Sequence, residues 1–562
     1  MLTICNEPVK ALQQMRSPRV WQGILNTDLP GKIALAEIQL NHALASEERQ
    51  DLDKRLLALY ASVVQKFSKL HGEGTRCFLT RAPESLCLVG HHIKEFGGST
   101  NGIAMLETLL CVAPRTDGRV SIAHVEERFA PLEFDLLDGL PKARAINWAA
   151  HVLESRARET KSAIVPAGSA WCAPLKRALQ YYVNRHKGPT GQIELNIPGL
   201  NIVVGAILPL GAVGHSETTL AAAGLVAAMA ASGEWGQLPL SEFYEWLNEA
   251  QSGGHGRRSE IGPVVFGMAG EVLHVDVNPA RAKGRGLAHG CSLLTAHTGV
   301  AACPHGTGTS GVAAPEKPPV DALKNPAIRS ATTAIGIELL RQIAHEETLA
   351  LNDEALYRLL RGVPVRASRA EILKLVKNDK ARAEIQARFE KHPEPAEGYN
   401  LRGKLLYVLS EMRRADRATS AIRAGDAAGL GALMNIGQAG EANLIHDVTA
   451  LGQVREVFNL PACDSDAELH ARADDNSALW RESGRSGAST PETDLLCDLA
   501  GVVQGVLGAR YCEPNRVAIL CKTECVQLVI DALVGGYYAP RGFAAPLVEQ
   551  VYPCQGVGLV AI

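Results

Sequence analysis

Residues 81–98 have the sequence RAPESLCLVGHHIKEFGG, in which a short apolar run, Leu86–Val89, is followed at once by Gly90. Short apolar runs that are interrupted by glycine and proline are typical of strands and turns. The same pattern extends from Arg76 to Val125. This part of the chain is therefore predicted to form strands joined by turns, not helices.

A second strand-like segment, Gln192–Pro209, has the sequence QIELNIPGLNIVVGAILP. It continues into a glycine-containing turn with Gly211 and Gly214, and then into an alanine-rich segment, Thr218–Ala231, that is predicted to be a helix. A strand, a glycine turn and a helix therefore follow one another in this order. This order of elements is the first feature of the sequence that bears on chemical function.

Helical periodicity occurs on both sides of these strands. Residues 46–70 carry Leu52, Leu56, Leu59, Val63 and Phe67 at helical spacing, which predicts an amphipathic helix. Further helices are predicted at Ile335–Leu351, Glu354–Leu360, Arg369–Leu375, Asn400–Arg423 and Leu495–Leu507, and a strand at Val517–Leu520. The stretches 305–325 and 463–492 are predicted to be loose connections, the first because it is rich in glycine and proline.

The composition sets limits on function. The formal net charge of -3 and a pI of about 6.6 give no basic surface of the kind that binds nucleic acid or anionic membranes. The longest apolar stretch, Leu200–Ala231, is interrupted by polar residues, and no secretory signal is recognised, so a cytoplasmic protein is predicted. The 13 cysteines form no C-x-x-C pair and are predicted to be reduced.

Residues 81–98 resemble the signature RAPGRVNLIGEHTDYNGG that opens the galactokinases of the GHMP kinase superfamily. The register holds without a gap. The identical positions are Arg81, Ala82, Pro83, Leu88, Gly90, His92, Gly97 and Gly98.

Four further segments resemble the same family, in the same order. Residues 208–220 (LPLGAVGHSETTL) are similar to its phosphate loop. Residues 254–267 (GHGRRSEIGPVVFG), with the strand 271–276 after them, are similar to the segment that carries its catalytic aspartate. Residues 292–300 (SLLTAHTGV) are similar to a later strand, and residues 507–510 (LGAR) to the segment before its last glycine loop.

The resemblance implies an α+β fold of two domains with the active site in the cleft between them. It implies an N-terminal helical extension at 1–75, an N-terminal domain at 76–320 with the phosphate-loop region at 208–220, and a C-terminal domain at 321–562. The implied activity is ATP-dependent phosphorylation of a hydroxyl group on a sugar or sugar acid, with Mg²⁺ as the second cofactor. The sequence indicates no oligomeric state.

The resemblance also assigns site residues. Arg81 and Glu260 take the catalytic positions, where they would orient and deprotonate the accepting hydroxyl. Gly211, Gly214 and Ser216 take nucleotide-binding positions. The substrate would lie against the residues His91, His92, Lys94, Arg257 and Arg258. These basic side chains favour an acidic substrate, and the alternative is that they face solvent. For Arg81 and Glu260, the alternative to catalysis is an ordinary ion pair.

Two departures from the family keep other functions open. Glu217 places a carboxylate in the first turn of the phosphate-loop helix, where it either caps the helix or binds Mg²⁺. Residues 512–518 (CEPNRVA) replace the last glycine loop without a glycine, so the same backbone path is not expected. A pseudokinase that binds a sugar-like ligand without ATP is one alternative. An enzyme that performs acid/base or metal chemistry on a sugar acid is another, although the histidines near these segments lack the spacing of a metal site.

Overall fold

The structure, a computed structural model, describes residues 3–5, 14–26, 46–91, 93, 98–161, 170–207, 216–252, 258–277, 280–300, 325–344, 351–448, 455–458, 465–513 and 515–561. The chain divides into two compact units that are interleaved along the sequence. Unit 1 comprises Met1–Leu86, Gly102–Gly286 and Val551–Ile562, and unit 2 comprises Cys87–Asn101 and Leu287–Gln550. Both units combine helices with sheet, which confirms the predicted α+β class.

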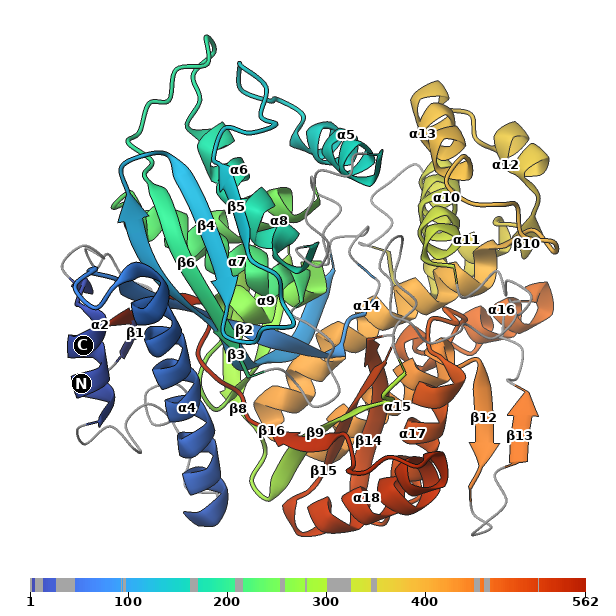
Figure 1. Cartoon of the computed structure of the whole chain (residues 1–562). Helices are drawn as coiled ribbons and strands as arrows, with labels where there is room; N and C mark the ends of the chain where they lie inside the picture. Colours follow the sequence, from blue (N-terminus) through green and yellow to red (C-terminus); the bar gives the residue numbers. More distant parts are fainter. Residues whose placement is uncertain are drawn as a thin grey trace. The chain divides into compact units, whose positions relative to one another are not determined.

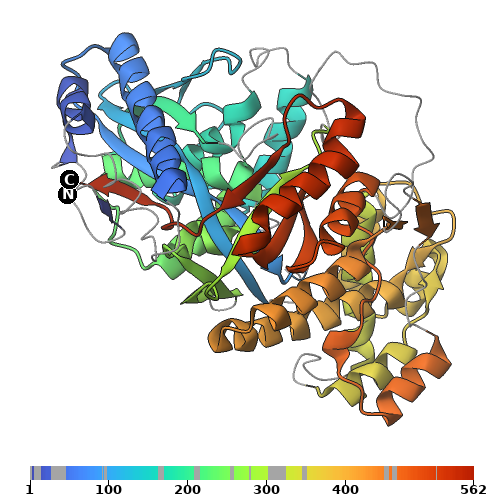
Figure 2. The ribbon, with the colours of Figure 1, turned by 90° about the horizontal axis from the view of Figure 1, so that it is seen from below.

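Unit 1 is built around one sheet, in which the described residues supply nine strands. They are β1 (Thr3–Cys5), β2 (Phe78–Val89), β3 (Ser99–Arg115), β4 (Arg119–His124), β5 (Leu132–Asp135), β6 (Gly199–Ala206), β7 (Glu271–Val277), β8 (Ala280–Gly286) and β17 (Gly558–Ala561). The order is β1-β17-β2-β3-β6-β4-β5, with β7 on β3 and β8 on β7. β1 pairs antiparallel with β17, so the first and last strands of the chain lie side by side (Figures 1 and 2).

Helices cover both faces of this sheet (Figure 1). They are α2 (Pro18–Asn26), α4 (Ser46–His71), α5 (Trp148–Lys161), α6 (Ala173–Arg185), α7 (Glu217–Ala231), α8 (Leu240–Ser252) and α9 (Arg258–Phe266). Side chains alternate across a strand, so Leu110 and Val112 of β3 join the core beneath α6 to α9, whereas Leu109 and Cys111 join the core beneath α2 and α4.

Two helices of unit 1 bury the residues that their sequence patterns predict to be buried. α4 buries Leu56, Val63 and Phe67 against the sheet, as its amphipathic spacing predicts. α7 is apolar on every side, and all its residues from Thr218 to Ala231 are buried. A helix without a polar face is stable only in a core, and α7 lies there, packed against α6.

Unit 2 contains a four-stranded sheet of order β14-β15-β9-β16 among its described residues. Its strands are β9 (Cys291–His297), β14 (Val506–Glu513), β15 (Arg516–Lys522) and β16 (Val548–Val551), and two small pairs join β10 (Arg366–Ala367) to β11 (Tyr399–Asn400) and β12 (Leu444–Asp447) to β13 (Arg455–Phe458). The helices are α10 (Pro326–Ala344), α11 (Asp353–Arg361), α12 (Arg369–Leu375), α13 (Asp379–Phe389), α14 (Leu401–Ala424), α15 (Ala427–Glu441), α16 (Asp466–Asp474), α17 (Pro491–Gly501) and α18 (Val526–Leu533).

Two large apolar cores occur among the described residues of unit 2. One lies between the four-stranded sheet and α17, α18 and the π-helical turn after α18. The other joins α10, α11, α14 and α16 through residues such as Leu340, Tyr357 and Leu405. Gly431 of α15 lets that helix approach β14 closely, since a Cβ there would lie 2.3 Å from the carbonyl oxygen of Leu507. No helix in the described part of either unit is long and apolar enough to cross a bilayer.

The stretch 463–492, predicted to be a loose connection, contains α16. Its prediction was therefore wrong for Asp466–Asp474. The signal was present in the sequence, because Ser465 and Glu468 form a capping box at the start of this helix. The other predicted loose stretch, 305–325, lies outside the described residues except for Asn325.

Candidate functional site around helix α7

The start of α7 is the part of the predicted nucleotide site that the structure describes. Ser216 is the N-cap residue, and its hydroxyl accepts a hydrogen bond of 3.1 Å from the backbone N–H of Thr219. The helix follows β6, so a strand and a helix flank the predicted phosphate loop. Gly211 and Gly214 of that loop lie outside the described residues.

Two carboxylate side chains, Glu84 and Glu217, lie at the start of α7. Glu84 accepts a hydrogen bond of 3.3 Å from the backbone N–H of Ser216. Glu217 is 62% exposed and its Oε1 lies 3.8 Å from Nη2 of Arg177. Acidic side chains in the first turn of a helix interact favourably with the helix dipole, so this arrangement stabilises α7. It also makes the site acidic, which disfavours a phosphate group unless a cation lies between them.

Glu260, a predicted catalytic residue, lies in the first turn of α9 and is partly buried. Its Oε2 accepts a hydrogen bond of 3.3 Å from the hydroxyl of Thr218, the second residue of α7. The structure therefore brings Glu260 to the start of α7, because Thr218 directly follows Ser216 and Glu217 in the sequence. A partly accessible carboxylate that is oriented by a hydroxyl group is able to accept a proton.

Arg81, the other predicted catalytic residue, lies in the interior of unit 1. Its side chain is 0% exposed, and Nε donates to Oε2 of Glu107, also 0% exposed, at 2.7 Å. Nη1 donates to the carbonyl oxygens of Gln555 at 2.5 Å and Gly556 at 3.0 Å. Arg81 thus ties β2 to β3 and to the C-terminal segment before β17, and its catalytic role stays a prediction.

The predicted substrate residues are described only in part. His91 is buried in unit 2, where its Nε2 donates to the carbonyl oxygen of Cys87 at 3.1 Å. Burial and the nearby Arg510 lower the pKa of His91, which favours the neutral ring at pH 7. The residues His92, Lys94 and Arg257, and the side chain of Arg258, lie outside the described part of the chain.

A buried charge network in unit 2 holds the segment that contains His91. Glu411 of α14 accepts hydrogen bonds from the backbone N–H groups of Gly90 at 2.7 Å and His91 at 3.1 Å. Two guanidinium groups flank the same carboxylate, Arg510 and Arg414, each at 2.7 Å. Burial raises the pKa of Glu411, but the two arginines outweigh it and bring the value to about 2.

Sequence reasoning found one end of this network and missed the rest. The LGAR segment indicated Arg510, whereas Glu411 and Arg414 lie within a helix whose pattern shows only an amphipathic stripe. Charged residues three apart are common on exposed helix faces, so their spacing gave no sign of burial.

Residues 512–513 and 516–518 lie where the resemblance places the last glycine loop, and the structure describes them as the end of one strand and the start of the next. Cys512 and Glu513 end β14, and Arg516 begins β15. Glu513 and Arg516 are paired across the turn, and their side chains form an ion pair of 2.7 Å. The sequence between these two strands contains no glycine whose backbone a ligand could approach closely. Among the described residues no group of three or more histidine, cysteine, aspartate or glutamate side chains could hold a metal ion.

Comparison with known proteins identifies the fold. No protein-family model matches the chain, and comparison with curated protein sequences gives no match. Among solved structures, Lactococcus lactis galactokinase complexed with galactose is 15% identical, with a TM-score of 0.51, over 88% of this chain and 97% of that one. The Lin0012 protein of Listeria innocua is 10% identical, with a TM-score of 0.42, over 86% and 99%. The Methanococcus jannaschii mevalonate kinase is 12% identical, with a TM-score of 0.38, over 85% and 98%. The galactokinase structure, with its TM-score of 0.51, shows that this chain has a galactokinase-like fold, as residues 81–98 predicted.

Proposed function

We propose, from the galactokinase-like fold of this chain, that it is a small-molecule kinase that transfers the terminal phosphoryl group of ATP to a hydroxyl of a sugar or sugar acid. The observation that carries the proposal is the contact between Glu260 and the start of α7, where the Thr218 hydroxyl donates a hydrogen bond of 3.3 Å to the Glu260 carboxylate. In this fold the proposed phosphate site and the proposed base are therefore adjacent. Fold alone does not establish an activity, so the proposal depends on these residues.

In this proposal Glu260 is the general base that accepts the proton of the attacking hydroxyl. Its partial exposure gives access to a substrate, and the Thr218 hydroxyl orients the carboxylate. In this proposal Arg81 supports the site indirectly, because it fixes β2, β3 and the segment of Gln555 and Gly556 to one another. Phosphoryl transfer requires mainly positioning and charge stabilisation, so such support matters.

The start of α7 is the proposed nucleotide site, with Ser216 and Glu217 as the described residues that would hold Mg-ATP. Mg²⁺ would supply the positive charge that stabilises a transferring phosphoryl group. Glu217 is 62% exposed, so its carboxylate is accessible to a cation, and carboxylates are ordinary Mg²⁺ ligands. The neighbouring Glu84 adds negative charge, and ATP without a divalent cation is therefore expected to bind poorly here.

The hairpin of residues 512–518 favours a second candidate function. The Glu513–Arg516 ion pair closes a turn where galactokinases have a glycine loop. A chain of this fold without that loop could bind a sugar-like ligand and no nucleotide, and act as a sensor or partner subunit.

A measurement of enzymatic turnover distinguishes the kinase from the ligand-binding protein without ATP. The purified chain is incubated with Mg-ATP and a panel of sugars and sugar acids, and ADP formation is measured. The kinase proposal predicts acceptor-dependent ADP formation that falls about 100-fold or more in Glu260→Gln, since a general base contributes that much. Glu242→Gln, which changes an exposed carboxylate in the first turn of α8, is the matched control and retains activity. Equal rates in both variants would remove Glu260 from the mechanism.

A further inference from the structure

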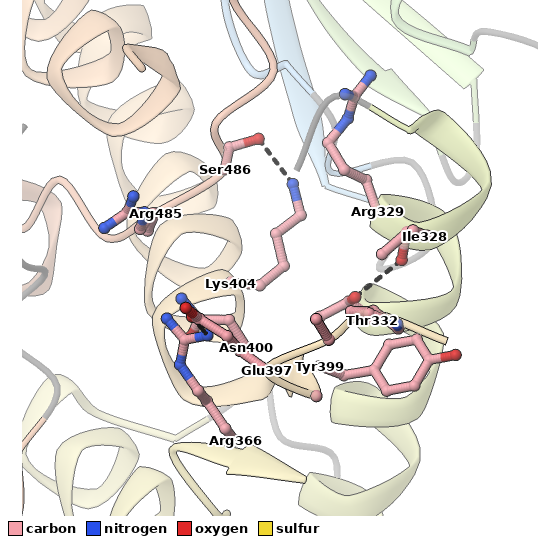
Figure 3. A pocket seen from close by; sticks show the side chains of 13 residues that line it. Ile328, Arg329, Thr332, Arg366, Glu397, Tyr399, Asn400, Lys404, Arg485 and Ser486 are labelled. Atoms are coloured by element: carbon pink, nitrogen blue, oxygen red, sulfur yellow. Dashed lines mark hydrogen bonds and ion pairs between the residues drawn. The ribbon is translucent and has the colours of Figure 1, made fainter. Parts of the chain in front are cut away.

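Unit 2 contains a pocket of about 300 Å³ that none of the predicted site residues in the described part of the chain lines (Figure 3). It lies between α10, α14, the β10–β11 pair and the segment after α16. The lining residues are Ile328, Arg329, Thr332, Arg366, Pro395, Ala396, Glu397, Gly398, Tyr399, Asn400, Lys404, Arg485 and Ser486. A volume near the lower end of the range for ligand pockets suits a molecule of monosaccharide size.

The charge of this lining is strongly positive. Four of its residues are cationic, and they come from separate elements: Arg329 from α10, Arg366 from β10, Lys404 from α14 and Arg485 from the segment after α16. The only carboxylate among these lining residues is Glu397, which forms an ion pair with Arg366. Cations from four elements that line one concave site attract a multiply charged anion.

Lys404 is the most buried of these cations, at 4% exposure. Its Nζ donates to the hydroxyl of Ser486 at 2.7 Å and lies 5.1 Å from the ring centre of Tyr407. Removing an ammonium group from water costs free energy, and an anion in the pocket would offset that cost. Figure 3 shows the Lys404 side chain extending from α14 toward Ser486, alongside the pocket wall formed by Arg329 and Thr332.

The start of α14 adds to the positive potential. The helix is 24 residues long and begins at this pocket, with Asn400 as its N-cap. Asn400 accepts a hydrogen bond from the N–H of Gly403, and the N–H of Leu401 donates to the carbonyl of Val365. Because these donors already have partners, the helix contributes its dipole and not a set of vacant N–H groups.

We infer that this pocket binds a small phosphorylated organic molecule of about the size of a hexose phosphate. The guanidinium groups of Arg329 and Arg485 bind phosphate oxygens through paired N–H donors, and Lys404 supplies a point charge. Thr332, Asn400 and Ser486 offer polar groups for hydroxyls of the organic part. This ligand is additional to the substrates of the proposed kinase reaction, and its binding would let a phosphorylated metabolite act on unit 2.

Isothermal titration calorimetry of the full chain tests this inference. The titrants are glucose 6-phosphate, inorganic phosphate, citrate and glucose. Glucose 6-phosphate is expected to bind, more weakly as NaCl is raised, and more tightly than inorganic phosphate; glucose is expected not to bind. Each of Lys404→Met and Arg485→Gln weakens binding about 10-fold or more, since each removes a charged hydrogen bond.

The control is Arg358→Gln, which removes an exposed guanidinium of α11 that pairs with Glu354 outside the pocket and leaves binding unchanged. If Lys404→Met fails to fold, Arg485→Gln and Arg329→Gln, at partly exposed positions, decide the result. Binding that these variants do not weaken would place the ligand elsewhere and overturn the inference. Citrate binding without glucose 6-phosphate binding would overturn the phosphate assignment. Neither result depends on ATP, so the inference can fail while the kinase proposal stands.

Discussion

Replacing Arg81 by methionine should strongly destabilise unit 1, whatever the reaction. Arg81→Met keeps the apolar stem but removes the 2.7 Å ion pair to Glu107 and the hydrogen bonds to two backbone carbonyls. Glu107 is 0% exposed and would lose this ion pair while it stays buried. Breaking a buried pair in this way costs about 3–5 kcal/mol of unfolding free energy.

The assay is urea unfolding followed by tryptophan fluorescence and circular dichroism. Adding Glu107→Gln to Arg81→Met removes the buried charge, and about 1.5–3 kcal/mol of the loss should return. Arg119→Met is the control, because Arg119 and its partner Glu133 are 53% and 47% exposed, and its effect should stay below about 1 kcal/mol. Equal effects of Arg81→Met and Arg119→Met, or no recovery in the double variant, would refute the buried role of Arg81.

Three further predictions concern stability. The pKa of Glu411 is about 2 in the folded chain against a usual 4.5. Its ionised carboxylate therefore contributes about 3 kcal/mol to the unfolding free energy above pH 4.5, and this contribution is lost as the pH falls toward 2. Glu411→Gln should make the unfolding free energy less dependent on pH between 4.5 and 2, and an unchanged pH profile would contradict this. Gly431→Ala should cost about 1–3 kcal/mol in urea unfolding, because its Cβ would lie 2.3 Å from the carbonyl oxygen of Leu507, whereas Gly535→Ala meets nothing within 4 Å and should be near neutral. Ser216→Ala removes the α7 N-cap and should lower the unfolding free energy by about 1 kcal/mol; no change in urea unfolding would mean that the cap is dispensable.

Local patterns predicted the elements that depend on neighbours in sequence. The helix expected at Thr218–Ala231 is α7 (Glu217–Ala231), and the helix expected at Arg369–Leu375 is α12 with the same bounds. The strand-like segment Gln192–Pro209 was too long at its start, because β6 begins at Gly199. Periodicity and capping are local properties, so they identify such elements but define their ends less well.

Contacts between distant segments could not be predicted from the same patterns. β1 pairs with β17 from the opposite end of the chain, and neither short strand has a pattern that names its partner. The candidate site shows the same limit. Glu260 was found through its place in a family segment, but its hydrogen bond to Thr218 requires α7 and α9 to pack together. Likewise, nothing in the sequence indicated that Glu107 is the carboxylate that pairs with Arg81.

The most direct test of the kinase account is a calorimetric titration of the chain with ATP, with Mg²⁺ and with EDTA, followed by thermal unfolding at saturating nucleotide. The account predicts binding that requires Mg²⁺, because Glu84 and Glu217 make the start of α7 acidic. At a nucleotide concentration of 100 times Kd, the native state should gain about 2.7 kcal/mol. Absence of nucleotide binding, together with clear binding of a sugar acid, would contradict the kinase account and favour a pocket of the same fold that no longer uses ATP.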